Sequence, residues 1–158
     1  MPASVDSNHY VARETAISVL INVALSLFFT WLSFGGEAYA PRDSVLVDFA
    51  PQTFMIALMG SLVPAAITRG KLRKGAVLPL EPGSGRYPRN LFLRSLLIAV
   101  LVALVVGGIA VALTLASGAE TFSFGPLMVG KAIYGAVVAL IVTPVAIRMA
   151  LRDGCPSQ

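Results

Sequence analysis

Residues 69–94 read RGKLRKGAVLPLEPGSGRYPRNLFLR, a basic segment that lies between long apolar runs. Proline removes a helical hydrogen bond and glycine weakens a helix, and this segment contains Pro79, Pro82, Gly83, Gly85 and Pro88. One continuous helix through the segment is therefore excluded. We expect a basic loop over 69–94 that joins two apolar halves of the chain.

The composition indicates a membrane protein. The chain has 158 residues, of which 56% are hydrophobic and only 13% are charged, about half the charged share of ordinary soluble domains. The apolar residues form runs of about 20, the length of a helix that spans a bilayer. We predict an all-α integral membrane protein, a single membrane domain over 1–158, with four transmembrane helices at 16–34, 49–68, 91–116 and 124–150.

The basic residues predict the orientation of these helices. Arg42 alone lies on one side of the predicted bundle, and Lys131 lies within a helix. All the others lie on the opposite side: Arg13, Arg69, Lys71, Arg73, Lys74, Arg86, Arg89, Arg94, Arg148 and Arg152. Cytoplasmic loops carry an excess of Lys and Arg. We therefore expect a bacterial inner (plasma) membrane protein with both termini and the 69–94 loop in the cytoplasm.

The same basic residues bear on partners. The net charge is +4, which in a soluble protein would suggest nucleic acid. Here the charges flank apolar runs, and no basic face with aromatic residues lies outside them, so we expect no nucleic-acid partner. Basic clusters next to a membrane attract anionic lipids. We expect the 69–94 loop to contact anionic lipid headgroups.

A small-residue stretch, Ala38-Tyr-Ala40, offers another interpretation of the first apolar run, as a signal peptide. The run is longer than the 7–15 apolar residues of a signal sequence. Pro41 would also directly follow the cut. We expect the first run to be a transmembrane helix instead.

Two parts of the chain resemble each other, over about 13–69 and 94–148. Matching positions include Arg13 with Arg94, Pro64 with Pro144, and the Phe-x-Pro motifs at 49–51 and 124–126. Each part has two predicted helices, so two tandem repeats would be related by an axis along the membrane normal. Chance similarity between apolar helices is the alternative.

The run Thr143-Pro-Val-Ala-Ile-Arg148 ends the last predicted helix. It resembles a family of small, uncharacterised bacterial inner-membrane proteins built from two-transmembrane-helix repeats. The resemblance covers the second helix of each half. It implies an architecture and no chemistry.

Signatures of an enzyme are lacking in the sequence. The only histidine and the only cysteine, His9 and Cys155, lie near the termini, where neither has an evident catalytic partner. No carboxylate lies within the four predicted segments, and no cluster has metal-ligand spacing. We expect no enzyme, no catalytic residue, no cofactor and no metal. An interfacial enzyme using Asp43, Asp48 or Glu120 is the alternative.

Lys131 is the one ionisable residue well inside a predicted helix, roughly 10 Å beyond Phe124. A lysine there either extends its ammonium outward to water or is held inside as an anion or proton site. Tyr134 is one turn away on the same helical face. We expect polar groups of the first two helices to hold Lys131. The candidate polar site comprises Lys131, Tyr134, Thr30, Ser33, Gln52 and Asn22.

Asn22 belongs to a polar stripe on the first predicted helix. The stripe follows one helical face through Ser18, Asn22, Ser26, Thr30 and Ser33. Lipid cannot satisfy an amide, so this face should meet other helices. The segment 91–116 has no such stripe, and we expect it to be the most lipid-exposed.

Two functions fit these features. The first is a permease-like transport protein acting as a homo-oligomer, which rests on the repeat, the polar stripe and Lys131. The second is a structural or accessory subunit of a larger membrane complex, which rests on the small residues, the short loops and the lack of any enzyme signature. A requirement for Lys131 would favour the first.

Overall fold

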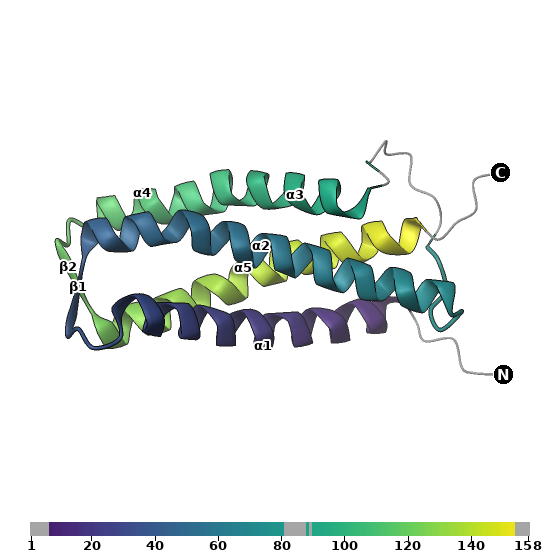
Figure 1. Cartoon of the computed structure of the whole chain (residues 1–158), viewed down its shortest axis with the longest axis horizontal. Coiled ribbons are helices and arrows are strands. Elements are labelled where there is room, and N and C mark those ends of the chain that lie inside the picture. The colour runs from purple at the N-terminus through teal and green to yellow at the C-terminus, as the bar shows by residue number, and fades with distance from the viewer. Residues whose placement is uncertain (1–6, 81–87, 89, 154–158) are drawn as a thin grey trace.

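The computed structural model describes residues 7–80, 88 and 90–153 and forms a bundle of long helices (Figure 1). Arg86, Arg89 and Cys155 lie outside the described residues. The elements, in chain order, are α1 (Ser7–Phe34), β1 (Tyr39–Pro41), α2 (Arg42–Arg73), α3 (Leu91–Val102), η1 (Ala103–Gly107), α4 (Gly108–Ala116), β2 (Thr121–Ser123) and α5 (Phe124–Arg152). The short π-helical η1 joins α3 and α4 into one run over Leu91–Ala116.

Four helical runs are long and apolar enough to cross a membrane: α1, α2, the α3–η1–α4 run and α5. The α3–η1–α4 run is the most apolar, with a mean hydropathy of 3.1 over its most apolar stretch of 18 residues. Only 17% of that stretch is buried. The corresponding buried shares in α1, α2 and α5 are larger. The run without a polar stripe is thus the one with most surface left outside the bundle.

Helix α2 begins earlier than the sequence predicts. It starts at Arg42, directly after an extended Pro41, and it contains Pro51 within the helix rather than in its first turn. The predicted start at residue 49 is therefore wrong, since the helix already includes residues 42–48. Asp43 in the first turn interacts favourably with the helix dipole, which helps a polar segment begin a helix.

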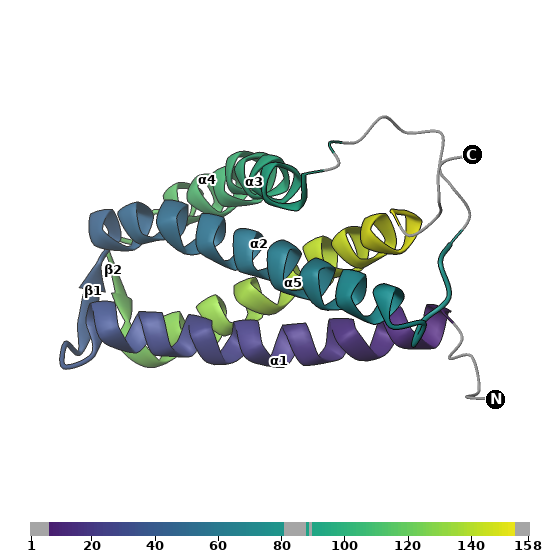
Figure 2. The ribbon, with the colours of Figure 1, turned by 45° about the vertical axis from the view of Figure 1, so that its right-hand side comes forward.

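The helices pack in an interleaved order. Helices α2 and α5 pack together at the centre, α1 packs mainly against α5, and the α3–η1–α4 run packs mainly against α2 (Figure 2). Contact between α1 and α2 is sparse although they are consecutive. Each half of the chain therefore places its first helical run against the second long helix of the other half.

A two-stranded antiparallel ribbon closes one end of the bundle. Strands β1 and β2 pair with Ala40 opposite Phe122. The pairing continues into the helices, since the Arg42 amide donates to the Glu120 carbonyl at 2.9 Å and the Phe124 amide donates to the Ala38 carbonyl at 3.1 Å. The sequence did not predict these three-residue strands, which fix the starts of α2 and α5 side by side.

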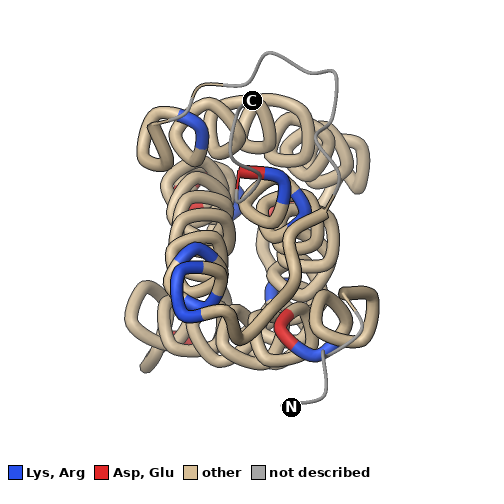
Figure 3. The backbone as a smooth tube through the Cα atoms, turned by 90° about the vertical axis from the view of Figure 1, so that its right-hand side faces the viewer, with Lys and Arg blue, Asp and Glu red and all other residues tan. Residues whose placement is uncertain are grey.

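The other end of the bundle carries most of the positive charge (Figure 3). The start of α1, the end of α2, the start of α3 and the end of α5 all lie there (Figure 1). Lys71 pairs with Glu14 at 2.7 Å, and Asp153 accepts from Arg69 at 2.7 Å and from Arg94 at 2.8 Å. These ion pairs connect all four helical runs at the basic end.

The Phe-x-Pro motifs occupy different places in their helices. Phe49 is well inside α2, whereas Phe124 is the first residue of α5. The two motifs are therefore not equivalent positions of a repeat. The residues before the two helices do match in conformation, since Pro41 has φ −62° and ψ 141° and Ser123 has φ −63° and ψ 138°.

Candidate functional site

Lys131 lies inside the bundle and is only 1% exposed. Its ammonium forms an ion pair with the Asp48 carboxylate and donates to the Gln52 side-chain oxygen at 2.8 Å. The interpretation that Lys131 extends outward to water is therefore wrong. The side chain instead joins α5 to α2.

Because α2 begins at Arg42, Asp48 lies within the helix, where it pairs with Lys131. Asp48 and Gln52 are four residues apart on α2, so both side chains lie on the same helical face. That face packs against α5. The Asp48 side chain is 19% exposed and also accepts a hydrogen bond from the Ser33 hydroxyl at 3.2 Å. The buried ammonium is thus connected to the surface through one carboxylate.

Aromatic rings complete the surroundings of the ammonium. The Lys131 Nζ lies 4.7 Å from the centre of the Phe49 ring and 5.7 Å from that of Phe34. A ring face attracts a cation electrostatically, and more strongly away from water. Phe49 in turn meets Tyr134 edge-on, with ring centres 5.3 Å apart. We name Lys131, Asp48, Gln52, Ser33 and Phe49 the lysine cluster.

The six predicted site residues do not form one site. Gln52 contacts Lys131 directly, and Ser33 reaches it through Asp48. The hydroxyl of Tyr134 lies 2.6 Å from that of Thr53, and Thr30 donates to the Ser26 carbonyl on its own helix at 2.7 Å. Asn22 belongs to a second group of polar side chains, described below.

Gln52 links the lysine cluster to the stripe of α1, because its amide nitrogen donates to the Ser26 hydroxyl at 3.3 Å. The stripe faces the bundle as predicted through Ser18, Asn22, Ser26 and Thr30, all buried, whereas Ser33 at its end is exposed. Helix α1 approaches α5 closely at Gly135, where a Cβ would collide with the Ser26 hydroxyl. The small residue is therefore required for α1 and α5 to meet.

A second, neutral group lies further toward the basic end. The Asn22 amide nitrogen donates to the Ser18 carbonyl at 2.7 Å and contacts the Ser18 hydroxyl at 3.2 Å. The Ser18 hydroxyl lies 2.8 Å from that of Thr143, which donates to the Gly60 carbonyl at 3.2 Å. We name Asn22, Ser18, Thr143 and Gly60 the asparagine cluster. It joins α1, α5 and α2.

Pro64 explains why the Gly60 carbonyl takes part. A proline within a helix has no N–H, so the carbonyl four residues earlier loses its usual partner. For Pro64 that carbonyl belongs to Gly60, and the Thr143 hydroxyl supplies the missing donor. The Thr143 hydroxyl donates its one proton to the Gly60 carbonyl, so the Ser18 hydroxyl must donate to the Thr143 oxygen. Donor and acceptor are thus assigned for each hydrogen bond in the asparagine cluster.

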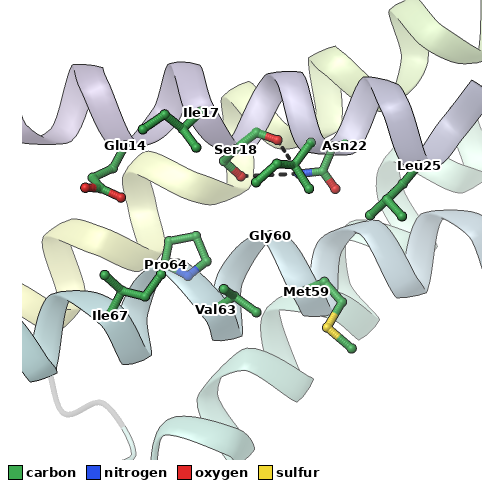
Figure 4. A pocket seen from close by; sticks show the side chains of 11 residues that line it. Glu14, Ile17, Ser18, Asn22, Leu25, Met59, Gly60, Val63, Pro64 and Ile67 are labelled. Carbon is green, nitrogen blue, oxygen red and sulfur yellow. Dashed lines mark hydrogen bonds between the residues drawn. The ribbon is translucent and has the colours of Figure 1, made fainter.

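One atom of the asparagine cluster remains open. The Asn22 side-chain oxygen is buried and has no hydrogen-bond partner among the described residues. The orientation of the amide is fixed, because only its nitrogen can donate to the Ser18 carbonyl. In Figure 4 the nitrogen is turned toward Ser18 and the oxygen away from it.

A groove lies beside Asn22, between α1 and α2 (Figure 4). Its volume is about 110 Å³, several times what one water molecule needs. Apolar side chains from both helices form most of its walls, with Ser18, Asn22 and Gly60 at its base and Glu14 at one end. Lys131 does not line it. The two clusters therefore have separate surroundings.

The position of Asp48 differs from the one that the sequence predicts. The expectation that no carboxylate lies within a helical segment is wrong, because Asp48 is inside α2 and paired with Lys131. Two signals pointed there: Pro41 followed by an acidic first turn, which is typical of a helix start, and the four-residue spacing of Asp48 and Gln52. Thr143 and Gly60 were also missed as partners of the stripe.

Among residues 7–80, 88 and 90–153, no group of three or more His, Cys, Asp or Glu side chains could hold a metal ion. Comparisons of the chain with protein-family models, curated proteins and solved structures gave no match.

Proposed function

We propose that this chain is a multi-pass protein of the bacterial inner membrane that acts as a permease-like transport protein in a homo-oligomer. Four helical runs with the length and composition of membrane spans support the membrane location. The collection of positive charge at one end supports a cytoplasmic position for both termini and the 69–94 loop. That end would lie among anionic lipid headgroups.

The observation that carries the transport proposal is the lysine cluster. Ionisable residues within membrane segments are rare and mark ion pathways, proton relays or ligand sites. Lys131 is almost fully buried, while its partner Asp48 is partly exposed near the ribbon end. A proton or a small anion arriving from that end would meet the pair first at Asp48.

A row of polar side chains extends from the lysine cluster into the bundle. Gln52 contacts both Lys131 and Ser26, and the next turn of α1 carries Asn22 and Ser18. The row provides successive hydrogen-bonding groups between the ribbon end and the middle of the bundle. Side chains of this kind are needed wherever a polar species passes through an apolar environment.

The proposal is tested by ion flux into proteoliposomes that contain the full purified chain. A pH-sensitive dye inside the vesicles reports protons and a chloride-sensitive dye reports anions, each under an imposed membrane potential. We expect one of the two fluxes to exceed that of protein-free vesicles. Equal fluxes with and without protein, for both dyes, would refute transport of these ions.

Variants of Lys131 connect any flux to the site. Lys131→Met keeps the length and removes the charge, so flux should fall to the protein-free rate while the chain still inserts. Lys131→Arg keeps a charge that cannot be deprotonated. Rescue by arginine indicates that charge alone is required, and failure of both variants indicates a proton-bearing or tightly shaped site. Unchanged flux in Lys131→Met would show that Lys131 is not needed for transport and would refute the proposed site.

The orientation is tested by reporter fusions after Gln158 and within residues 75–85. Both should report the cytoplasm, because the basic residues of these regions favour that side. A periplasmic signal from either fusion would overturn the proposed topology.

A second function, an accessory subunit of a larger membrane complex, is favoured by the α3–η1–α4 run. This run is the most apolar in the chain and leaves most of its surface outside the bundle. A larger partner could cover that surface. Extraction in mild detergent followed by native mass spectrometry distinguishes the two functions, since a homo-oligomer supports transport and a stable larger assembly supports the accessory role.

We also propose that the two halves are tandem two-helix repeats, as in the family that the Thr143–Arg148 run resembles. The interleaved packing of α1 on α5 and of the α3–η1–α4 run on α2 is what a two-fold axis along the membrane normal would produce. The antiparallel pairing of Ala40 with Phe122 supports the proposal, because a two-fold axis through the ribbon would relate the start of α2 to the start of α5.

A further inference from the structure

We propose that the groove between α1 and α2 binds a neutral amphiphile, a molecule with an apolar body and one hydroxyl group that donates to the Asn22 side-chain oxygen. The inference rests on the proposed membrane location and not on transport. It concerns a part of the bundle that the lysine cluster does not reach.

The walls of the groove determine the apolar body of the ligand. Ile17 and Ile21 of α1 face Met59, Val63 and Ile67 of α2 across the groove, and each of these five side chains is more than a third exposed. The groove exists because α1 leans on α5 and makes little contact with α2. From Glu14 to Leu25, α1 rises by roughly 16 Å. An elongated apolar chain or ring system fits such a slot.

The base of the groove determines the polar group. Asn22 is 1% exposed, and its side-chain oxygen has no donor among the residues that the structure describes. Leaving a buried acceptor without a donor costs about 1–3 kcal/mol. The neighbouring hydroxyls cannot supply one, because Ser18 donates to Thr143 and Thr143 donates to Gly60. A ligand that brings one O–H satisfies the cluster.

The charges around the groove favour a neutral ligand. Glu14, at the end of the groove nearest the basic side, already pairs with Lys71 at 2.7 Å. The remaining lining residues are uncharged. An ionised headgroup next to Asn22 would lose its hydration without gaining a counter-charge, which is costly in an apolar site. A plain acyl chain would cover the walls and leave the Asn22 oxygen open.

The inference is tested by photolabelling the full chain in lipid nanodiscs. The probe is a long-chain alcohol with a diazirine on its chain, and the control probe is the methyl ether of the same compound, which has no donor. Mass spectrometry then locates the label. We expect the alcohol to label the segments 14–25 and 59–67 about five-fold more than the ether, the factor that corresponds to one hydrogen bond.

Two variants assign the labelling to the groove. Asn22→Leu removes the acceptor, so alcohol and ether should label equally. Val63→Trp fills the groove from its exposed rim without touching Asn22, so both probes should lose labelling there, even if Asn22→Leu proves unstable. Leu20→Ala is the matched control, since Leu20 is on α1, exposed and outside the groove, and it should label like the wild type.

Three results would overturn the inference: equal labelling by alcohol and ether in the wild type, an unchanged preference in Asn22→Leu, or cross-links between two chains through 14–25 and 59–67. The last result would assign the groove to a second copy. The ion-flux experiment is independent of the labelling. Labelling without flux would support ligand binding in the groove and refute only the transport of the tested ions.

Discussion

The lysine cluster and the asparagine cluster both join α1, α2 and α5 through polar side chains, yet they differ in whether every buried polar group has a partner. At the lysine cluster the buried ammonium has a carboxylate, an amide oxygen and an aromatic ring as partners. At the asparagine cluster one amide oxygen has none among the described residues.

The difference follows from the energy of each group. An unpaired buried charge costs several kcal/mol, so a fold that contains Lys131 must also supply Asp48. An unpaired neutral oxygen costs about 1–3 kcal/mol, which a fold can tolerate. A tolerated open acceptor beside a groove is where a ligand can gain most. The charged cluster therefore determines the packing, and the neutral cluster has room for binding.

The largest expected effect comes from removing the partner of Lys131. Asp48→Asn should lower the free energy of unfolding by about 3 kcal/mol, because it leaves the ammonium buried without a counter-charge. Reversible unfolding in mixed detergent micelles, followed by circular dichroism, measures the change.

Asp43→Asn is the control for this variant. Asp43 is on the same helix, its side chain is 87% exposed, and its contact with Arg42 lies at the surface, so the change should stay within about 0.5 kcal/mol. Adding Lys131→Met to Asp48→Asn should restore part of the loss. A double variant less stable than Asp48→Asn alone would contradict the assignment of the pair.

The next largest effect should come from the close approach of α1 and α5, between the two clusters. Gly135→Ala places a Cβ against the Ser26 hydroxyl and 3.3 Å from the Asn22 carbonyl oxygen. We expect a loss of about 2 kcal/mol from overpacking, measured by the same unfolding experiment. Gly130→Ala is the matched control, since its Cβ would meet nothing within 4 Å. Equal stability of the two variants would show that α1 and α5 are further apart at Gly135 than the structure has them.

A smaller effect is expected from the hydroxyl that holds the asparagine cluster together. Thr143→Val keeps the shape but leaves the Gly60 carbonyl without its donor, so we expect a loss of about 1.5 kcal/mol, near the upper range for hydrogen bonds between membrane helices. Thr114→Val is the control, because the Thr114 hydroxyl donates to the Ala110 carbonyl of its own helix. If both variants unfold alike, Thr143 does not bridge the helices.

The smallest effect is expected from Asn22→Leu. Among the described residues, the Asn22 amide nitrogen donates to Ser18 of its own helix, and the Asn22 side-chain oxygen has no partner to lose. We expect the free energy of unfolding to fall by about 0.6 kcal/mol, the average contribution of a side-chain hydrogen bond between membrane helices. A loss as large as that of Asp48→Asn would show that the amide has a structural role, and it would argue against an open binding acceptor.

Hydropathy could predict the helices wherever a helix and its apolar run coincide. The run Leu91–Ala116 has the same bounds in the sequence prediction and in the structure, because it is apolar from end to end. The predicted start of α2 was seven residues late, at 49 instead of 42, because residues 42–48 include three charges. The partner of the Asp48 charge inside the bundle is Lys131, over eighty residues away in the sequence.

The candidate site is predictable only in part, because its side chains have partners that are distant in the sequence. The spacing of the stripe on α1 predicts which side chains face inward, and the burial of Ser18, Asn22, Ser26 and Thr30 confirms it. Spacing within one helix does not say which helix lies opposite. The three-residue spacing of Lys131 and Tyr134 predicts a shared site on one face of α5, but the Tyr134 hydroxyl lies against that of Thr53 instead.

The interleaved packing has a consequence for biosynthesis. The stripe of α1 meets its main partner, α5, only at the end of the described chain, and α5 is completed about 120 residues after α1. At ribosomal rates of about 5–20 residues per second, this delay is on the order of ten seconds. During that interval Ser18 and Asn22 have neither Thr143 nor Gly135 to pack against. Until α5 is complete, α2 alone can cover the stripe of the nascent first helix, for example through Gln52 at Ser26, and a chaperone or a second nascent chain would have to protect the remaining polar face.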